Sequence, residues 1–171
     1  MGQVKPKVEL LRYTSEPEKA IALAAKLCYS DADIEKLKQG VDSSDTEKFI
    51  SNLLTFGHLS PIEHASFTFG IEGVSRSFLA QITRHRIASF SVKSQRYVKE
   101  GDEFNYVIPP EIENLGKEKK ELFISQMDTM AKWYSEWIKE LGNKGEKSNE
   151  DARFVLPNAP ETKMIITMNA R

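Results

Sequence analysis

A long segment with apolar side chains at helical spacing constrains the fold more than any other feature of the sequence. Between positions 117 and 141, apolar residues recur every three or four positions, as on one face of an amphipathic helix. The stripe consists of Leu122, Phe123, Met127, Met130, Ala131, Tyr134, Trp137, Ile138 and Leu141. We therefore predict one helix over 117–141, and its apolar face is broad enough to serve both the core and a subunit contact.

Shorter segments before and after this helix carry strand and helix patterns. Strands are predicted over 8–13, 65–72, 104–108 and 161–167. Further helices are predicted over 17–28, 31–38, 45–56, 75–83 and 149–156. Because strands and helices fall in separate runs, the expected fold class is α+β, with an antiparallel or mixed sheet flanked by helices. We expect residues 1–171 to form a single domain.

Local patterns predict two helix caps and the setting of the cysteine. Ser44 and Glu47 have the spacing of a capping box, and Asn149 is placed to cap the helix that ends before Pro157. Gly73 is predicted to end the strand 65–72. Cys28 falls on the predicted apolar face of the first helix, so we interpret it as a small core residue and not as a nucleophile.

Composition limits the class of protein. With 171 residues, of which 40% are hydrophobic and 29% charged, the chain can bury the core of one domain. The formal net charge of -1 gives no global attraction to nucleic acid or to an anionic membrane. One cysteine excludes an internal disulfide, and no apolar run approaches the roughly 20 residues of a membrane helix. A cytoplasmic location is expected.

The segment 84–97 concentrates cationic and hydroxyl side chains. Arg84, Arg86 and Arg96 carry planar guanidinium groups that can each hold a phosphate through two hydrogen bonds. His85 and Lys93 add further nitrogen donors, and three serines lie between these residues. Composition leaves two interpretations open: a site for a ligand with more than one phosphate, and a solvated basic face with scattered salt bridges.

The order of residues in this segment carries a resemblance. The Arg-His-Arg tripeptide at 84–86, followed after seven residues by Ser94, resembles the signature of the flavin-dependent thymidylate synthases, the thymidylate synthase complementing protein family. The Gln-Arg-Tyr tripeptide at 95–97 is similar to the usual continuation. The family commonly has Asn-Glu where this chain has Ser-Val at 91–92, so a role for that glutamate is absent here.

Three other segments resemble the same family. The run 58–64 is similar to the family's His-x-(Ser/Thr)-Pro-x-Glu-His segment beside the flavin. A metal site in this run is disfavoured because its histidines lack the spacing of a helical zinc site, and a proline turn with satisfied histidines is the plain alternative. Arg153 precedes a Val-Leu-Pro run as in the family, and Asn-Ala-Arg at 169–171 matches a flavin-contacting motif.

The resemblance implies a role for each matching residue. Around the nucleotide it implies Gln81, Arg84, Ser94, Gln95, Arg96 and Arg153. Around FAD it implies Ser60, Glu63, Arg84, His85, Arg86, Ile87, Asn169 and Arg171. As catalytic residues it implies Ser94, which would orient and polarise dUMP without attacking it, and His58. No metal is implied.

The resemblance also implies the reaction. In it dUMP becomes dTMP, methylenetetrahydrofolate gives the carbon, and NADPH reduces FAD, which supplies the hydride. No enzyme nucleophile is expected, and the absence of a reactive-looking cysteine is consistent with this. The family's homotetramers share active sites between subunits, so a homotetramer is expected.

Where the sequence stops, family members continue into a further helix with more flavin contacts, so we expect a C-terminally incomplete domain. Two alternatives to a working enzyme follow. One is a fragment that binds nucleotide and flavin without turnover, which bound yellow flavin without tritium release from labelled dUMP would favour. The other is a phosphate-binding or RNA-binding module, which salt-sensitive RNA binding would favour.

Overall fold

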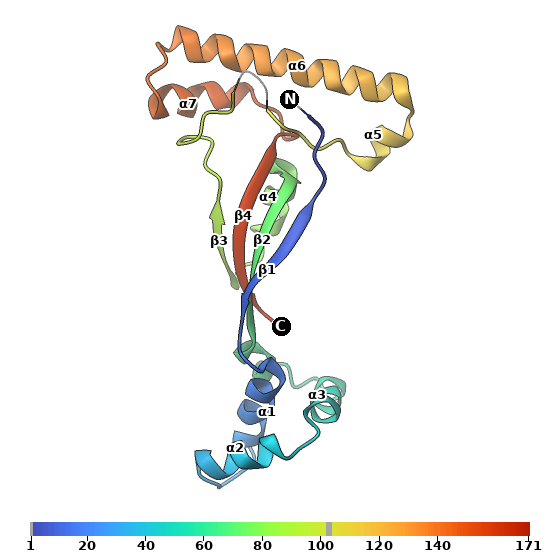
Figure 1. Ribbon diagram of the computed structural model, residues 1–171, viewed down its shortest axis with the longest axis vertical. Coiled ribbons are helices and arrows are strands. Elements are labelled where there is room, and N and C mark those ends of the chain that lie inside the picture. Colours follow the sequence, from blue (N-terminus) through green and yellow to red (C-terminus); the bar gives the residue numbers. More distant parts are fainter. Residues whose placement is uncertain (1, 102–103) are drawn as a thin grey trace. The chain divides into compact units, whose positions relative to one another are not determined.

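The computed structural model describes residues 2–101 and 104–171 (Figure 1), so the last two positions of the polar stretch 99–103 lie outside the described residues. The elements in chain order are β1 (Lys7–Tyr13), α1 (Pro17–Leu27), α2 (Ile34–Asp42), α3 (Thr46–Thr55), η1 (Ser60–His64), β2 (Ser66–Ser75), α4 (Arg76–Ile82), β3 (Ala88–Val92), α5 (Pro110–Asn114), α6 (Lys117–Glu140), α7 (Glu146–Ala152), η2 (Arg153–Val155) and β4 (Glu161–Asn169). The two η elements are single 3₁₀ turns.

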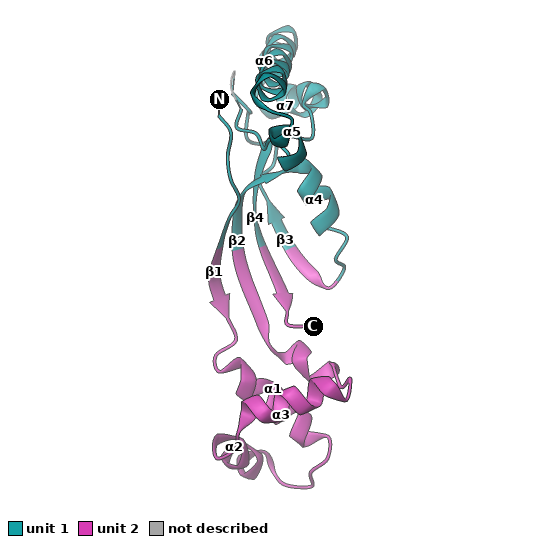
Figure 2. Ribbon diagram, turned by 90° about the vertical axis from the view of Figure 1, so that its right-hand side faces the viewer, with its two compact units in different colours: residues 1–8, 70–86, 90–165 teal, residues 9–69, 87–89, 166–171 magenta. Residues whose placement is uncertain are grey.

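The chain divides into two compact units, which are described separately below. Unit 1 contains residues 1–8, 70–86 and 90–165, and unit 2 contains residues 9–69, 87–89 and 166–171 (Figure 2). The boundary between the units crosses all four strands, so each strand contributes residues to both. Within the described residues no helix has the length and apolar composition to cross a bilayer.

The four strands form one antiparallel sheet in the order β1-β2-β4-β3, which confirms the predicted α+β class. At the end of β1 the Thr14 N–H donates to the Ser66 carbonyl at 2.9 Å. The hydroxyls of Thr68 and Thr167 pair across β2 and β4 at 2.9 Å. The last strand in the sequence therefore lies between the second and the third, an order that one sequence does not reveal.

Gly73 lies inside β2, so the prediction that it ends the strand is wrong. Its φ of 69° is a conformation that other residues rarely adopt. A Cβ atom at this position would lie 1.9 Å from the Lys5 carbonyl oxygen. The Gly73 N–H donates to the Glu161 carboxylate at 3.1 Å, so this backbone donor is satisfied by a side chain. The glycine thus permits a close backbone approach and does not interrupt the sheet.

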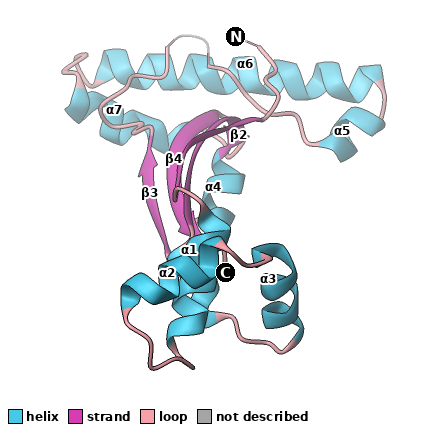
Figure 3. Ribbon diagram, turned by 60° about the horizontal axis from the view of Figure 1, so that its bottom comes forward, coloured by secondary structure: helices cyan, strands magenta, loops and turns pink. Residues whose placement is uncertain are grey.

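In unit 1, α6 forms the core together with the extended segment 104–108. The predicted helix 117–141 is confirmed almost to the residue by α6 (Figure 3), because its apolar stripe from 122 to 141 continues for about five turns. Buried on its inner face are Met127, Ala131, Tyr134 and Ile138. Burial raises the pKa of the Tyr134 phenol, which is therefore neutral at working pH.

The predicted strand 104–108 is wrong, although its side chains are buried. Phe104, Tyr106 and Ile108 pack against α6, while only Tyr106 makes isolated bridges, to Gln3 and Pro160. The alternating pattern reflects burial on one side of an extended segment and not membership of a sheet. The short helix α5, which follows this segment, was not predicted.

In unit 2, α1 packs against α2, α3 and η1 through Ile21, Ala22 and Ala25. This buried face differs from the predicted apolar face, which included Cys28. In the structure Cys28 follows the helix and its thiol is exposed. The prediction that Cys28 is a core residue is therefore wrong. The helix ends at Leu27, which leaves the cysteine at the capping position outside the packed face.

Both predicted helix caps are wrong as well. Asp45 caps α3 by accepting the Lys48 N–H at 3.0 Å, and the Ser44 hydroxyl donates to the Val41 carbonyl of the preceding helix. Helix α7 begins at Glu146, so Asn149 lies within it and is buried. Helix α2 begins at Ile34 and runs to Asp42, so it starts and ends later than the predicted helix 31–38.

Candidate functional site

The Arg-His-Arg tripeptide follows α4 directly in unit 1. The last turn of the helix is closed by the N–H groups of Arg84 and His85, which donate to the carbonyls of Gln81 and Ile82 at 3.1 Å. The side chains of Gln81, Arg84, His85 and Arg86 are all exposed and form no hydrogen bond or ion pair with any described residue. The structure therefore presents four polar side chains, two of them fixed cations, that are available to a ligand.

The other half of the signature is a hydrogen-bonded turn in unit 1. The half-buried Ser94 Oγ accepts the N–H groups of Arg96 and Tyr97 at 3.2 and 3.4 Å. The Val98 N–H donates to the Ser94 carbonyl at 3.0 Å. Because the hydroxyl oxygen accepts from the backbone, its proton is left to donate to a ligand.

Arg96 fastens this turn to helix α7. Its guanidinium pairs with the carboxylates of Glu146 at 2.6 Å and Glu150 at 3.2 Å. The buried Asn149 side chain donates to the Arg96 carbonyl at 3.0 Å. The guanidinium also lies 5.6 Å from the centre of the Tyr97 ring. A phosphate that reaches Arg96 must share it with two carboxylates.

Arg153 and Gln95 lie on the same part of unit 1. Arg153 follows α7 directly, and its Nε donates to the Glu150 carbonyl at 3.2 Å. Its guanidinium has no carboxylate partner among the described residues. Gln95 is only 8% exposed, and its Nε2 lacks a partner within the described part of the chain. These two groups retain unused donors beside the Ser94 turn and α7.

Among the predicted flavin residues of unit 2, those in η1 and at the end of β4 are joined by an ion pair, whereas Ile87 precedes β3 and is exposed. The Arg171 guanidinium pairs with the Glu63 carboxylate at 2.6 Å, and the Arg171 N–H donates to the Asn169 side chain at 3.1 Å. Ser60 begins η1 and is exposed. The His58 side chain is exposed too, and the backbone N–H of this residue donates to the Leu53 carbonyl at 3.1 Å.

Comparison with known proteins identifies the family. The family model described as thymidylate synthase complementing protein matches residues 9–171. The chain belongs to this family. A flavin-dependent thymidylate synthase of Clostridium tetani is 48% identical over 176 residues, which cover 96% of this chain and 70% of that protein. One of Geobacter sulfurreducens is 48% identical over 166 residues, covering 96% of this chain and 69% of that protein.

A solved structure shares the fold. It is the UMP/dUMP methylase PolB from Streptomyces cacaoi bound with 5-Br dUMP, with a TM-score of 0.76 at 24% identity, covering 99% of this chain and 75% of that one. The predicted resemblance to the flavin-dependent thymidylate synthases is confirmed, and the chain is an enzyme of that family.

The family's predicted residues divide between the two units. Every residue predicted around the nucleotide lies in unit 1, where α4, the Ser94 turn and α7 carry them. Those predicted around the flavin lie partly in unit 1, at 84–86, and partly in unit 2. No three His, Cys, Asp or Glu side chains in the described ranges are arranged to hold a metal ion.

The prediction of site residues missed the carboxylates that hold Arg96. Glu146, Glu150 and Arg153 follow one another at intervals of four and three residues, which places them on one face of a helix. This spacing was visible in the sequence, but the partner of the two carboxylates, Arg96, is about fifty residues earlier in the chain and could not be inferred from it.

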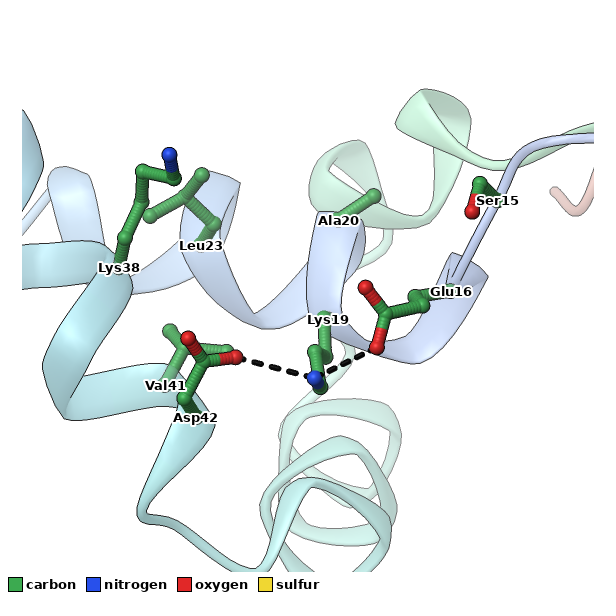
Figure 4. Close-up of a pocket in the computed structure, with 8 residues that line it drawn as sticks. All are labelled: Ser15, Glu16, Lys19, Ala20, Leu23, Lys38, Val41 and Asp42. Atoms are coloured by element: carbon green, nitrogen blue, oxygen red, sulfur yellow. Dashed lines mark ion pairs between the residues drawn. The ribbon is translucent and has the colours of Figure 1, made fainter.

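A pocket in unit 2 contains none of the predicted site residues. It lies between α1 and α2, has a volume of about 250 Å³ and is shown in Figure 4. At its edge the Lys19 ammonium pairs with Glu16 at 2.5 Å and with Asp42 at 3.0 Å. The hydrogen bond from Lys19 to Glu16 raises the pKa of Lys19, so its charge is already balanced within the protein.

Proposed function

We propose that this chain methylates dUMP reductively to dTMP, with methylenetetrahydrofolate as carbon donor and NADPH-reduced FAD as hydride source. One observation supports this above all others. In a member of the thymidylate synthase complementing protein family, the exposed side chains of 84–86 have no hydrogen-bond or ion-pair partner among the described residues, while the Ser94 turn beside α7 is already fixed.

The proposed nucleotide site uses donors that the protein leaves unsatisfied. Ser94 would donate its hydroxyl proton to dUMP and so orient and polarise it. Arg153 would bind the phosphate through the two terminal nitrogens of its guanidinium, because only its Nε is engaged and it has no carboxylate partner among the described residues. Gln81, Arg84, Gln95 and Arg96 complete the proposed set.

The residues proposed for FAD have the chemistry that a pyrophosphate requires. Arg84, His85 and Arg86 are exposed donors with no partner in 2–101 or 104–171, and two of them are permanent cations. In unit 2, Ser60, Glu63, Ile87, Asn169 and Arg171 are proposed as further flavin contacts. When bound, FAD would supply hydride-transfer chemistry that no side chain can provide.

The protein's own part in the reaction is positioning and proton transfer. The proposed mechanism needs no cysteine, and Cys28 is not among the residues that match the family's motifs. The exposed His58 imidazole, whose two ring nitrogens can donate and accept a proton, is the group proposed for proton transfer.

A homotetramer with shared active sites is part of the proposal. Exposed apolar side chains on α6 support an assembly, since Leu122, Trp133 and Trp137 are each about half exposed. Light scattering at two protein concentrations tests it. A mass of four chains is expected, and a monomer at micromolar concentration would contradict it.

The function is tested by titrating the purified chain with FAD, with and without dUMP, and recording the flavin absorbance. We expect a perturbed flavin band that sharpens when dUMP is added, and tritium release from 5-tritiated dUMP when the folate donor and NADPH are present. Flavin binding without tritium release would indicate a non-catalytic fragment. A flavin band that neither shifts nor responds to dUMP would overturn the proposal.

A further inference from the structure

The loop 94–99, which carries the Ser94 turn, follows β3 in unit 1, and the two residues that flank it are bonded to each other (Figure 1). On one side the Lys93 N–H donates to the Lys163 carbonyl of β4 at 2.9 Å, so the loop begins where the sheet ends. On the other side Glu100 follows the loop, and its Oε2 pairs with the Lys93 ammonium at 2.9 Å. An ion pair thus closes the base of the loop.

This ion pair lies in the interior of unit 1. The Glu100 side chain is 7% exposed and the Lys93 side chain 27%. Burial raises the pKa of the Tyr134 phenol, and the negative charge of Glu100 raises it further, so Glu100 lies near the buried face of α6. Opposite charges attract more strongly out of water, and salt screens them less than an exposed pair. The contact at the base of the loop is therefore strong and directional.

Stability alone is a weak reason for such a pair. Moving two charges out of water costs about as much as their attraction returns, so apolar side chains of similar volume are often as stable in the same place. Here the cost is only partly offset, because the second carboxylate oxygen, Glu100 Oε1, is buried without a partner within the described ranges. An ion pair does fix the distance and direction between two residues, which an apolar contact leaves free.

The Ser94 turn needs such a constraint on its orientation. The Ser94 Oγ accepts the N–H groups of Arg96 and Tyr97, and the Ser94 carbonyl accepts the N–H of Val98. These local bonds set the internal shape of the turn but not its direction. Arg96 anchors the far side of the turn to α7. On the near side, Lys93 directly precedes Ser94, so its ion pair limits where the hydroxyl can point.

We propose that the ion pair between Lys93 and Glu100 positions the Ser94 hydroxyl for the nucleotide, which makes both of them positioning residues that do not touch the substrate. This inference rests on the proposed function, because that function gives Ser94 its task. Neither residue is among those that the family motifs imply. Their assignment comes from their burial, their contact and their places at the two ends of the loop.

The first test measures the order of the loop without any ligand, by hydrogen exchange and mass spectrometry. In Glu100→Gln a charge-assisted hydrogen bond becomes a neutral one, so the amides of 94–99 should exchange about tenfold faster, while those of α6 stay unchanged. The matched control is Glu113→Gln, which breaks the exposed ion pair with Lys120 and should leave exchange in the loop unchanged. Unchanged exchange in Glu100→Gln would overturn the inference.

A double variant separates the ion pair from simple packing. Lys93→Met combined with Glu100→Leu fills the same place with apolar side chains, so the melting temperature should not fall. Exchange in 94–99 should still be faster than in the wild type, because the apolar pair does not fix the direction of the loop. If the double variant protects the loop as well as the wild type does, packing positions Ser94 and the inference is overturned.

The last test titrates the FAD-loaded chain with dUMP in a calorimeter. Glu100→Gln should bind dUMP about tenfold more weakly and FAD as tightly as the wild type. Glu100→Asp keeps the charge and should recover dUMP affinity, a rescue that a purely structural loss would not show. A faster-exchanging loop with full dUMP affinity would overturn the inference alone. A wild-type chain that binds no dUMP would overturn the proposed function and this inference together.

Discussion

The two halves of the basic segment differ in how much of their binding geometry the protein itself provides. At 84–87 the side chains are exposed and bound to no described residue. At 94–97 the Ser94 hydroxyl, the Arg96 guanidinium and the Arg96 carbonyl are all engaged by backbone or by α7. The second half is preorganised, while the first must be ordered by its ligand at a cost in side-chain entropy.

The largest effect on ligand binding is expected at 84–87, the half of the segment that the protein does not preorganise. Arg86→Gln should weaken FAD binding by about 100-fold, because it removes a charge-assisted contact, while the melting temperature stays unchanged. The melting temperature should not change because the Arg86 side chain forms no hydrogen bond or ion pair with a described residue. Flavin absorbance titration and a thermal scan measure the two quantities, with Arg12→Gln, which removes an exposed arginine from β1, as control. A clear drop in melting temperature would show that this half is structural.

The next largest effect is expected in the preorganised half. Asn149→Ala removes a buried donor and leaves the Arg96 carbonyl without its partner, so the free energy of unfolding should fall by about 1–3 kcal/mol. The dUMP affinity should fall with it, since the Ser94 turn loses an anchor. Urea unfolding and dUMP titration check this, with the exposed Asn114→Ala as control. If the destabilised variant binds dUMP with full affinity, the Ser94 turn does not contribute to dUMP binding.

The long helix and the signature could be predicted from sequence, but the contacts that distinguish the two halves could not. The 117–141 prediction is confirmed because one apolar stripe repeats over the whole helix. Asn149 was assigned as a helix cap from its local preference, whereas its actual partner is the Arg96 carbonyl, 53 residues away. A side chain with a distant hydrogen-bond partner has no local signal, and the same holds for Arg96 and its two carboxylates.

A smaller effect is expected for the ion pair between Arg96 and Glu150. Both side chains are more than two fifths exposed, so a double-mutant cycle with Arg96→Gln and Glu150→Gln should give a coupling free energy of about 0.2–1 kcal/mol. Salt should reduce it. If the nucleotide phosphate shares Arg96, the coupling should shrink further when dUMP is bound. A coupling that dUMP leaves unchanged would remove Arg96 from the proposed phosphate contacts.

The smallest effect is expected at Glu113, an exposed carboxylate outside the basic segment 84–97. It serves as a reference for the predictions within that segment. The hydrogen bond from Lys120 lowers the pKa of Glu113, and Gln3 adds a second donor. Because the folded pKa lies below the ordinary value of 4.5, the stabilisation is present above that pH and is lost as the pH falls through the folded value. The difference in urea midpoint between wild type and Glu113→Gln should therefore vanish in acid.

The control for this prediction is Glu111→Gln, two residues earlier on α5, which removes an exposed carboxylate that forms no ion pair with a described residue. Its urea midpoint should follow that of the wild type across the whole pH range. A difference between wild type and Glu113→Gln that grows as the pH falls would mean that the sign of the Glu113 shift is wrong.

The exposed cysteine at the end of α1 makes the protein easy to follow by fluorescence. Cys28 is the chain's one cysteine, so a maleimide dye attaches at a single known place in unit 2 without any mutation. Both tryptophans, Trp133 and Trp137, lie on α6 in unit 1. Energy transfer from these tryptophans to a dye on Cys28 would report on the separation of the two units, and on whether FAD or dUMP changes it.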